Sequence, residues 1–294
     1  MTLTIILICL IAERFLLEHS HLRSNNWFTR YCQWHQQQNL PEWMQQGMIG
    51  LLLLLILPLL AIAALQQLFS DSLLGIPGLL FSIGVLLYTM GPQDLESQIS
   101  QYAEAAELDD GEASMIARQI IGDEPPTSEP ARSQAVSEAA LQLANRRVIA
   151  VLFWFMLLGP LGAMMYRLAV WLPRSNQAAQ NIDFKLNSLQ LIIILDWLPA
   201  RITAFCYAIA GSFEDALIGW RNHQESRHSE FSDSNAGTLI CTGSGAMRLA
   251  TLLDESYAGA HPYSYLPKAA MALIWRSLIV FLVILALLTF SGLV

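Results

Sequence analysis

Residues 48–68 read "MIGLLLLLILPLLAIAALQQL" and contain no charged side chain. A helix needs about 20 apolar residues to cross the hydrocarbon layer of a membrane, so this stretch alone predicts a membrane-spanning helix. Farther out along the chain, apolar runs occupy residues 3–17, 73–90, 148–172 and 273–294. We therefore predict an all-α, polytopic helical membrane protein with about five spans. A re-entrant or interfacial helical hairpin and amphipathic loop helices complete the predicted fold.

The composition also indicates a membrane protein, and the distribution of charge excludes one class of partner. Of the 294 residues, 54% are hydrophobic and 14% are charged, whereas soluble domains have about 25% charged residues. The net charge is −8, and residues 93–138 hold eleven Asp or Glu side chains against two Arg. Because this acidic loop repels phosphates and no basic patch occurs elsewhere, we expect the lipid bilayer and no nucleic acid as a partner.

The apolar runs divide the chain into three regions. Residues 1–90 form an N-terminal membrane region with an interfacial loop and a helical hairpin, and residues 91–147 form an acidic cytoplasmic helical loop. Residues 148–294 form a C-terminal membrane region with a kinked span, a broken helix at 188–211, a polar loop at 212–267 and the final span. Arginines in the first two loops assign both to the cytoplasm by the positive-inside rule.

A pair of opposite charges lies inside the apolar segment "LDWLPARITAFCYAIAG", residues 195–211. A charge at membrane depth costs about 3 kcal/mol or more, so Asp196 and Arg201 must be paired, solvated or functional. Pro199 disfavours helix at the residue before it, which predicts a break in the helix. Two interpretations remain open: a salt bridge that stabilises the break, or a ligand site in which Arg201 binds a carboxylate or phosphate. Glu214 lies just beyond the segment and fits either one.

A further charge, Arg167, lies near the end of the run at residues 148–172. It either extends to lipid headgroups or, together with Tyr166, faces a polar cavity. Gly159 and Pro160 in the same run predict a kink.

Motifs of known catalytic sites are absent. "CTGSGAM", residues 241–247, contains a G-x-G pattern, but neither a preceding strand nor a Walker lysine accompanies it. His19, His21, Cys32 and His35 could in principle bind a metal, because imidazole and thiolate suit zinc, but they have no recognised ligand spacing. The four cysteines form no C-x-x-C pair. We therefore predict no catalytic residue, no metal site and no cofactor.

Three segments resemble one known family. They are "MTLTIILICLIAERFLLEH" (1–19), "FWFMLLGPLGAMMYRL" (153–168) and the segment at 195–211, of which "LDWLPAR" is the most specific part. Together they resemble the AmpE family of bacterial inner-membrane proteins over most of the chain. The resemblance implies a multi-pass protein of the Gram-negative inner membrane. It also implies a role in regulating inducible β-lactamase and a functional link with the amidase that recycles cell-wall muropeptides.

A more distant similarity is to the cobinamide-phosphate synthase family of membrane enzymes. The shared residues are Gly162-Ala163, Tyr166-Arg167, Pro199-Ala200-Arg201 and Ser234-Asn235-Ala236-Gly237. Carboxylates of that family are missing here, because their positions hold Ile192, Ile193, Gln142 and Arg146. Since carboxylates supply metal-binding and acid–base groups, the similarity implies a retained scaffold and anion-binding corner without the synthase chemistry.

We therefore expect a signalling or sensing component of the AmpE type that modulates β-lactamase induction and cell-wall recycling. It would do so by binding an anionic small ligand such as a muropeptide. The expected ligand-binding residues are Tyr166, Arg167, Asp196 and Arg201, with Glu13, Arg14, Glu214 and Asn235 as further candidates. A membrane enzyme of the synthase type and a transporter are the alternatives.

Overall fold

A computed structural model describes residues 2–16, 26–37, 47–70, 76–90, 95–175, 181–225 and 234–291. Every regular element in these ranges is a helix, which confirms the predicted all-α class. The helices form two compact units, each assembled from separate stretches of the chain. Unit 1 comprises Met1–Pro92, Ala150–Asp196 and Leu288–Val294, and unit 2 comprises Gln93–Ile149 and Trp197–Leu287.

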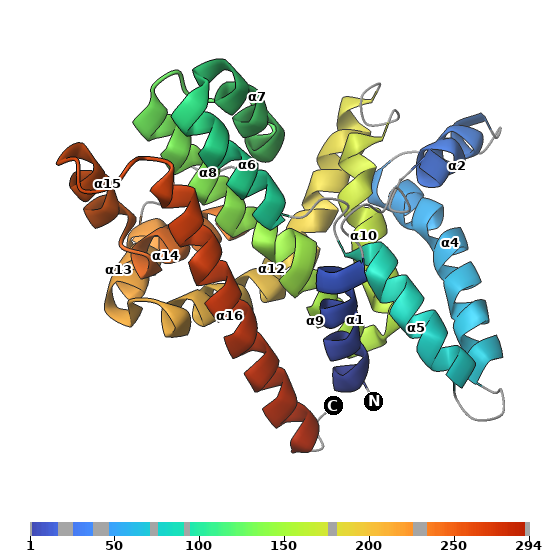
Figure 1. Ribbon diagram of the computed structural model, residues 1–294. Helices are drawn as coiled ribbons and strands as arrows, with labels where there is room; N and C mark the ends of the chain where they lie inside the picture. The colour runs from blue at the N-terminus through green and yellow to red at the C-terminus, as the bar shows by residue number, and fades with distance from the viewer. Residues whose placement is uncertain are drawn as a thin grey trace. The chain divides into compact units, whose positions relative to one another are not determined.

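Unit 1 contains the N-terminal helices and the helices around the charged segment. They are α1 (Thr2–Leu16), α2 (Asn26–Gln37), α4 (Gly47–Ser70), α5 (Ile76–Thr89), α9 (Ala150–Leu158), α10 (Pro160–Trp171), the short η3 (Leu172–Arg174) and the first part of α12 (Ile182–Ala210) (Figure 1). Aromatic contacts join several of them. The rings of Phe28 and Trp171 lie 6.0 Å apart, and the Tyr31 hydroxyl donates to the Leu54 carbonyl at 2.8 Å. The aromatic helix α2 is therefore held against both α4 and α10.

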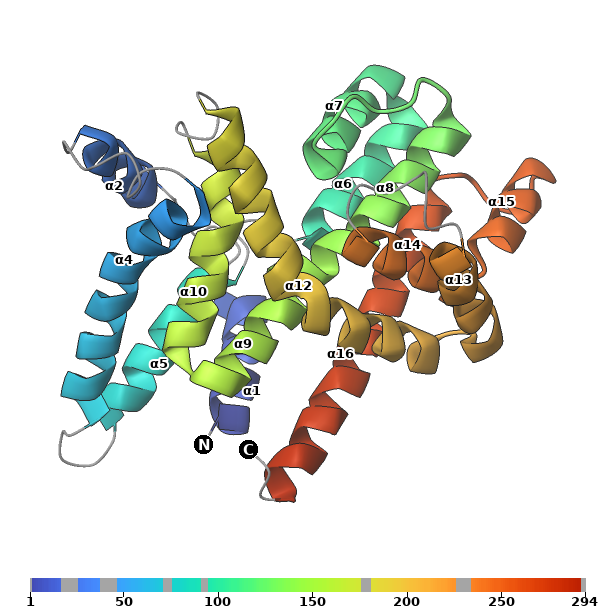
Figure 2. The ribbon, with the colours of Figure 1, turned by 180° about the vertical axis from the view of Figure 1, so that it is seen from behind.

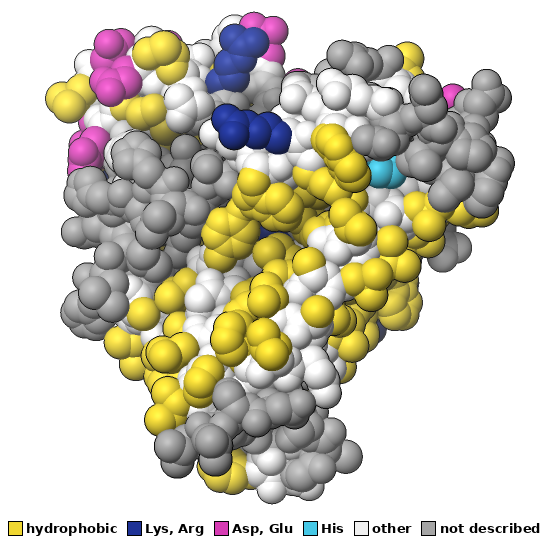
Figure 3. All heavy atoms as spheres, turned by 90° about the vertical axis from the view of Figure 1, so that its right-hand side faces the viewer, with side chains coloured by type: hydrophobic (Ala, Val, Ile, Leu, Met, Phe, Trp, Pro, Cys, Tyr) yellow, Lys and Arg dark blue, Asp and Glu magenta, His cyan; other side chains and the backbone are white. Residues whose placement is uncertain are grey.

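Helix α4 has the surface expected of a helix that faces lipid. Leu51, Leu54 and Leu55 are buried against the rest of unit 1. Many of its other large apolar side chains, including Leu52 and Leu60, are more than half exposed. Hydrophobic side chains are correspondingly gathered along this face of unit 1 (Figure 3). Because water disfavours so much exposed apolar surface, a bilayer is the environment that fits α4.

The described ranges contain four helices that are long and apolar enough to cross a membrane. These are Gly47–Phe69, Glu129–Leu158, Ile182–Ala210 and Tyr265–Phe290. Shorter apolar helices, Leu3–Ala12 and Ile76–Thr89, stand where the sequence predicted runs at 3–17 and 73–90. The predicted number of about five spans thus corresponds to four helices of sufficient length and two shorter ones.

The expectation of a single kinked span at residues 148–172 was wrong, because the chain reverses at Gly159. Helix α9 ends just before this glycine, whose φ of 64° lies in the left-handed region, and α10 begins with Pro160. A Cβ atom at Gly162 would lie 2.1 Å from the Trp154 carbonyl oxygen. The two helices are therefore in backbone contact, and α10 turns back beside α9 (Figures 1 and 2). A glycine free to adopt positive φ and a proline suited to the first helical position together make this turn.

Unit 2 combines the acidic loop with the C-terminal helices. Its elements are α6 (Leu95–Leu108), α7 (Asp110–Ile121), α8 (Glu129–Ala144), the π-helical η2 (Asn145–Ile149), the second part of α12, α13 (Phe213–Glu225), α14 (Ser234–Ala246), α15 (Leu249–Tyr257) and α16 (Tyr265–Phe290). One hydrophobic core, which includes Tyr102, Ala140, Tyr207 and Leu273, runs through the unit. Much of the segment predicted as a polar loop at 212–267 is thus helical.

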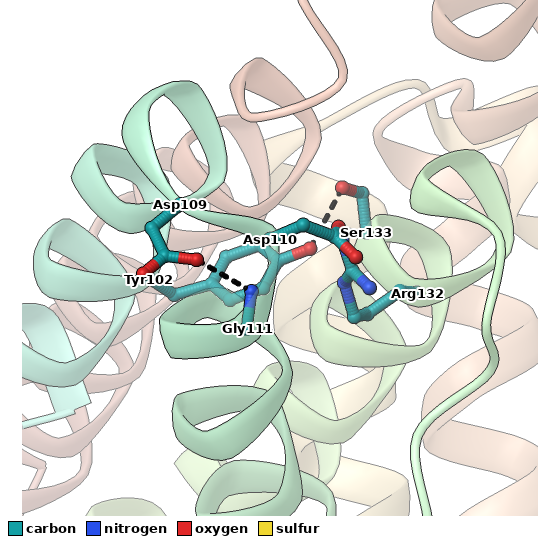
Figure 4. A network of polar contacts seen from close by, with 6 residues as sticks. All are labelled: Tyr102, Asp109, Asp110, Gly111, Arg132 and Ser133. Carbon is teal, nitrogen blue, oxygen red and sulfur yellow. Dashed lines mark hydrogen bonds and ion pairs between the residues drawn. The ribbon is translucent and has the colours of Figure 1, made fainter.

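The acidic loop is organised by polar contacts, some of them buried, among α6, α7 and α8 (Figure 4). Asp109 caps α7 by accepting from the backbone N–H two residues later at 2.8 Å. Arg132 is 2% exposed and pairs with Asp110 at the start of α7. The hydroxyl groups of Tyr102 and Ser133 lie 2.9 Å apart in the same buried region. A buried arginine at the centre of this loop offsets part of its negative charge, so the acidic sequence can fold compactly.

Helices α13 and α14 form a hairpin in which glycines bring the two backbones together. A Cβ atom at Gly219 would lie 2.2 Å from the Cys241 carbonyl oxygen, and one at Gly245 would lie 2.3 Å from the Asp215 carbonyl oxygen. Likewise, a Cβ atom at Gly237 would lie 2.1 Å from the ring of His223. The second glycine of the G-x-G pattern therefore serves helix packing, because it lies inside α14 and not in a phosphate loop.

Candidate functional site

The predicted break in the helix at residues 188–211 is absent, since α12 runs without interruption from Ile182 to Ala210 with Pro199 inside it. Proline lacks the N–H that would have bonded to the carbonyl four residues earlier, that of Leu195. The indole Nε1 of Trp154, on α9, donates to this same carbonyl oxygen at 3.3 Å. A side chain from a neighbouring helix thus satisfies the acceptor that Pro199 leaves free, and α12 continues through the proline.

Trp154→Phe is expected to destabilise the protein by about 1 kcal/mol, the usual net value of one hydrogen bond. With Pro199→Ala in place, the Leu195 carbonyl regains a backbone donor, so the same tryptophan substitution should cost less. Reversible unfolding of the four proteins of this cycle in mixed detergent micelles measures the difference. Equal costs of Trp154→Phe in both backgrounds would contradict the pairing, since loss of indole volume alone does not depend on the proline.

Asp196 belongs to a buried contact with α10. The Tyr166 hydroxyl donates to its Oδ1 at 2.6 Å, and the two residues are 0% and 2% exposed. Arg167, one residue along α10, is 3% exposed, and its guanidinium lies 5.6 Å from the centre of the Trp171 ring. Arg167 is therefore buried within the protein and does not extend from its surface to a headgroup. Short hydrogen bonds to a carboxylate are among the stronger ones, so this contact is a stable part of unit 1.

Arg201 lies in unit 2 and makes a different set of contacts. Its Nη1 donates to the Trp197 carbonyl at 2.7 Å and to Asn235 Oδ1 at 3.2 Å. Its guanidinium lies 4.2 Å from the centre of the Trp197 ring. It forms no ion pair with any residue that the structure describes. The predicted Asp196–Arg201 salt bridge is thus absent, because in a continuous helix five residues turn the side chain by about 140°.

The guanidinium of Arg201 is half-buried and keeps donors that no described residue uses. The planar guanidinium binds carboxylate and phosphate groups through two parallel hydrogen bonds. Arg201 therefore offers a net positive charge with free donors inside a helix that is long and apolar enough to cross a membrane. Asn235, 2% exposed at the start of α14, holds one side of this guanidinium in place.

Of the remaining predicted residues, the structure describes the side chain of Glu214 alone, and it takes no part in these contacts. Glu214 is exposed in the first turn of α13. Glu13 and Arg14 lie in α1, and their side chains are outside the described part of the structure. Of the predicted set, the structure brings together Tyr166 with Asp196, and Arg201 with Asn235.

Buried polar residues that sequence reasoning missed connect α12 to the helix formed by α8 and η2. The Thr203 hydroxyl donates to Asn145 Oδ1 at 2.8 Å, and the Tyr207 hydroxyl donates to the Leu141 carbonyl at 2.7 Å. All three polar side chains are fully buried, and the Asn145 amide nitrogen has no hydrogen-bond partner among the residues that the structure describes. The four-residue spacing of Thr203 and Tyr207 places them on one helix face, which was the available signal.

The described residues contain no group of three His, Cys, Asp or Glu side chains that could hold a metal ion. Cys32, considered above as a ligand, is buried in α2, and burial raises the pKa of its thiol to about 12. It therefore stays protonated near neutral pH and is a poor ligand.

Comparison with known proteins places these features in context. The model of a family described as "Regulatory signalling modulator protein AmpE" matches residues 1–294. A cobalamin biosynthesis protein CobD of Chromobacterium violaceum is 30% identical over 173 residues, which are 56% of this chain and 53% of that protein. The CobD protein of Stutzerimonas stutzeri is 29% identical over 169 residues, or 52% and 54% of the two chains. The chain thus spans about half the length of the curated relatives it matches, and no solved structure matches it.

Proposed function

Because this chain belongs to the AmpE family of regulatory signalling modulator proteins, we propose that it is a multi-pass signalling component of the bacterial inner membrane whose anionic ligand binds at Arg201. The observation that carries the proposal is the guanidinium of Arg201, which has no carboxylate partner among the described residues and retains free donors. A charge in such a helix is costly unless a partner neutralises it, and an anionic ligand would be that partner.

The contact between Tyr166 and Asp196 has a supporting role in this proposal. Both side chains are buried and bonded to each other, so they fit a role in fixing α10 against α12 better than a direct contact with a ligand. The ligand-binding role expected for Tyr166, Arg167 and Asp196 stays a prediction.

The proposed ligand is a muropeptide, and the proposed output is a change in β-lactamase induction and cell-wall recycling. Muropeptides carry carboxylates, which suit the fork of a guanidinium. A functional link with the muropeptide amidase would follow, since that enzyme acts on the same class of molecule.

Arg201→Ala is expected to abolish the effect of this chain on β-lactamase induction, because it removes the positive charge and the free donors. Induction by a β-lactam is measured in a strain that lacks the chain and is complemented with wild type, Arg201→Ala, Arg201→Lys or Arg221→Ala. Arg221 lies exposed on α13 and serves as the matched control. We expect Arg201→Lys to restore part of the response and Arg221→Ala to restore all of it.

Membrane levels of each variant decide how the result is interpreted. If Arg201→Ala is present at the wild-type level and restores the wild-type β-lactamase response, the assignment of the ligand site to Arg201 is wrong. If deletion of the chain leaves induction unchanged, the proposed output is wrong.

A second candidate function is a membrane enzyme of the cobinamide-phosphate synthase type, supported by the partial match to two CobD proteins. The missing carboxylates at Ile192, Ile193 and Arg146 oppose it. Growth of a synthase-deficient strain on corrinoid precursors separates the two functions, because only the enzyme would restore it. A transporter is tested by uptake of a muropeptide into proteoliposomes that contain the chain, because only a transporter would carry it across the membrane.

A further inference from the structure

An open pocket of about 480 Å³ lies within unit 2, against one side of α16. It is bordered by the start of α13, by the turn between α14 and α15, and by α16. Two arginines, Arg248 and Arg276, line it, together with the Tyr265 side chain. Ala269 and Ala272 on α16 leave the space open because their side chains are small. Its volume lies in the range of small-molecule sites, about 300–1,000 Å³.

Arg276 carries the positive charge of this pocket that no described carboxylate neutralises. It lies in α16, inside the Tyr265–Phe290 segment that is long and apolar enough to cross a membrane. Its Nε donates to the Ala272 carbonyl at 3.2 Å, and it forms no ion pair with a described residue. A cation on a membrane-type helix is usually neutralised by a partner or placed at the headgroup level.

Arg248 is held in an unusual conformation on the other side of the pocket. Its φ of 54° and ψ of 49° are left-handed, which few residues other than glycine adopt. Its Nε donates to Asp215 at 2.7 Å, and its Nη2 lies 3.5 Å from the Ser212 hydroxyl. The bonds from Ser212 and Arg248 hold the pKa of Asp215 below its ordinary value, so this carboxylate stays charged and neutralises Arg248.

These groups leave the pocket with one net positive charge and with an arginine from each of two elements in its lining. We propose that this pocket binds a phosphate group, with Arg276 as its main charged partner and Arg248 as a second donor. A phosphate suits the pocket because its oxygens can be shared by two guanidinium groups and the Tyr265 hydroxyl. The phosphate belongs either to a lipid headgroup or to a small soluble phosphate compound. This site is separate from Arg201, so it stands independently of the proposed function.

Titration calorimetry on the full chain in a maltoside detergent, whose headgroup carries no phosphate, tests the proposal with two probes, dioctanoyl phosphatidylglycerol and inorganic phosphate. Arg276→Gln removes the charge, Arg276→Lys retains it, and Ala272→Phe fills the pocket while leaving both arginines. Arg221→Gln, on the exposed surface of α13, is the matched control. We expect Arg276→Gln and Ala272→Phe each to weaken binding about tenfold or more, which is about 1.4 kcal/mol. Arg276→Lys should have an intermediate effect and Arg221→Gln almost none.

The two probes distinguish the sources of the phosphate. Binding of the lipid alone identifies a headgroup site, whereas binding of inorganic phosphate, with or without the lipid, identifies recognition of the phosphate itself. If neither probe binds, or if every variant binds as wild type does, the proposal is wrong. Arg276 is exposed, so its variants should fold, and a monodisperse elution profile for each variant confirms that a loss is not due to unfolding.

Discussion

Gly219→Ala and Gly245→Ala are each expected to destabilise the protein by about 3 kcal/mol, at the upper end of the usual cost of overpacking. A methyl group at either position would lie within 2.4 Å of a carbonyl oxygen on the opposite helix, at 2.2 Å for Gly219 and 2.3 Å for Gly245. These obstacles are backbone atoms that cannot rotate away. Helices α13 and α14 would therefore have to move apart along their whole contact.

The spacing of the contact residues explains why the effect should be large. On α14, Gly237, Cys241 and Gly245 are four residues apart, and they face His223, Gly219 and Asp215, which are four apart on α13. Residues four apart lie on one face of a helix, so the two helices meet along a single antiparallel line. A shift at one glycine therefore weakens packing at all three positions.

Gly84→Ala on α5 is the matched control for these substitutions. A Cβ atom at Gly84 meets nothing within 4 Å, and alanine favours helix by about 1 kcal/mol over glycine. In reversible unfolding by a denaturing detergent in mixed micelles, we expect this variant to unfold at the same denaturing-detergent concentration as wild type or at a higher one. If Gly219→Ala and Gly245→Ala behave as Gly84→Ala does, the close helix contact is not present in the protein.

The features predicted correctly are those that depend on apolar length. Residues 48–68 form most of α4, and most of the last apolar run, which carries the single charge of Arg276, lies in α16. A run of about twenty largely apolar residues has few folded alternatives to a long helix. The predicted amphipathic loop helices include α6, in which Leu95, Ile99 and Tyr102 recur on one face and are buried.

The errors arose where a neighbour from elsewhere in the chain decides the local structure. Pro199 predicts a break by its local chemistry, but Trp154, 45 positions earlier in the sequence, supplies the missing hydrogen-bond donor. Gly159 and Pro160 were predicted to kink the helix. Whether such residues kink a helix or reverse the chain direction depends on tertiary packing. In this protein Gly162 permits α10 to pack against α9, and the chain reverses.

The candidate site was predictable in its residue types but not in its pairings. A charge in an apolar helix signals a partner, and both Asp196 and Arg201 have specific ones. Those partners, Tyr166 and Asn235, lie 30 and 34 residues away in the sequence, so helix periodicity does not reveal them. The sequence around Asn145 gave no signal of its buried bond with Thr203.

Tyr166→Phe is expected to destabilise the protein by about 2–3 kcal/mol, because the hydrogen bond it removes is to a buried carboxylate. The hydroxyl lies 2.6 Å from Asp196 Oδ1, and neither residue is exposed to solvent by more than 2%. A buried carboxylate that loses a donor keeps its desolvation cost without the compensating bond. Reversible unfolding in mixed micelles measures the change, as for the glycine variants.

Tyr207→Phe gives the matched comparison, because Tyr207 is equally buried and its hydroxyl donates to a neutral acceptor, the Leu141 carbonyl, at 2.7 Å. We expect this variant to lose about 1 kcal/mol, the usual net value of a neutral hydrogen bond. The difference between the two tyrosines therefore reports the charge on Asp196. If both substitutions cost the same, Asp196 does not act as a charged acceptor. If Tyr166→Phe remains folded at wild-type level yet fails in β-lactamase induction, the contact serves signalling as well as stability, because loss of folded protein is then excluded as the cause.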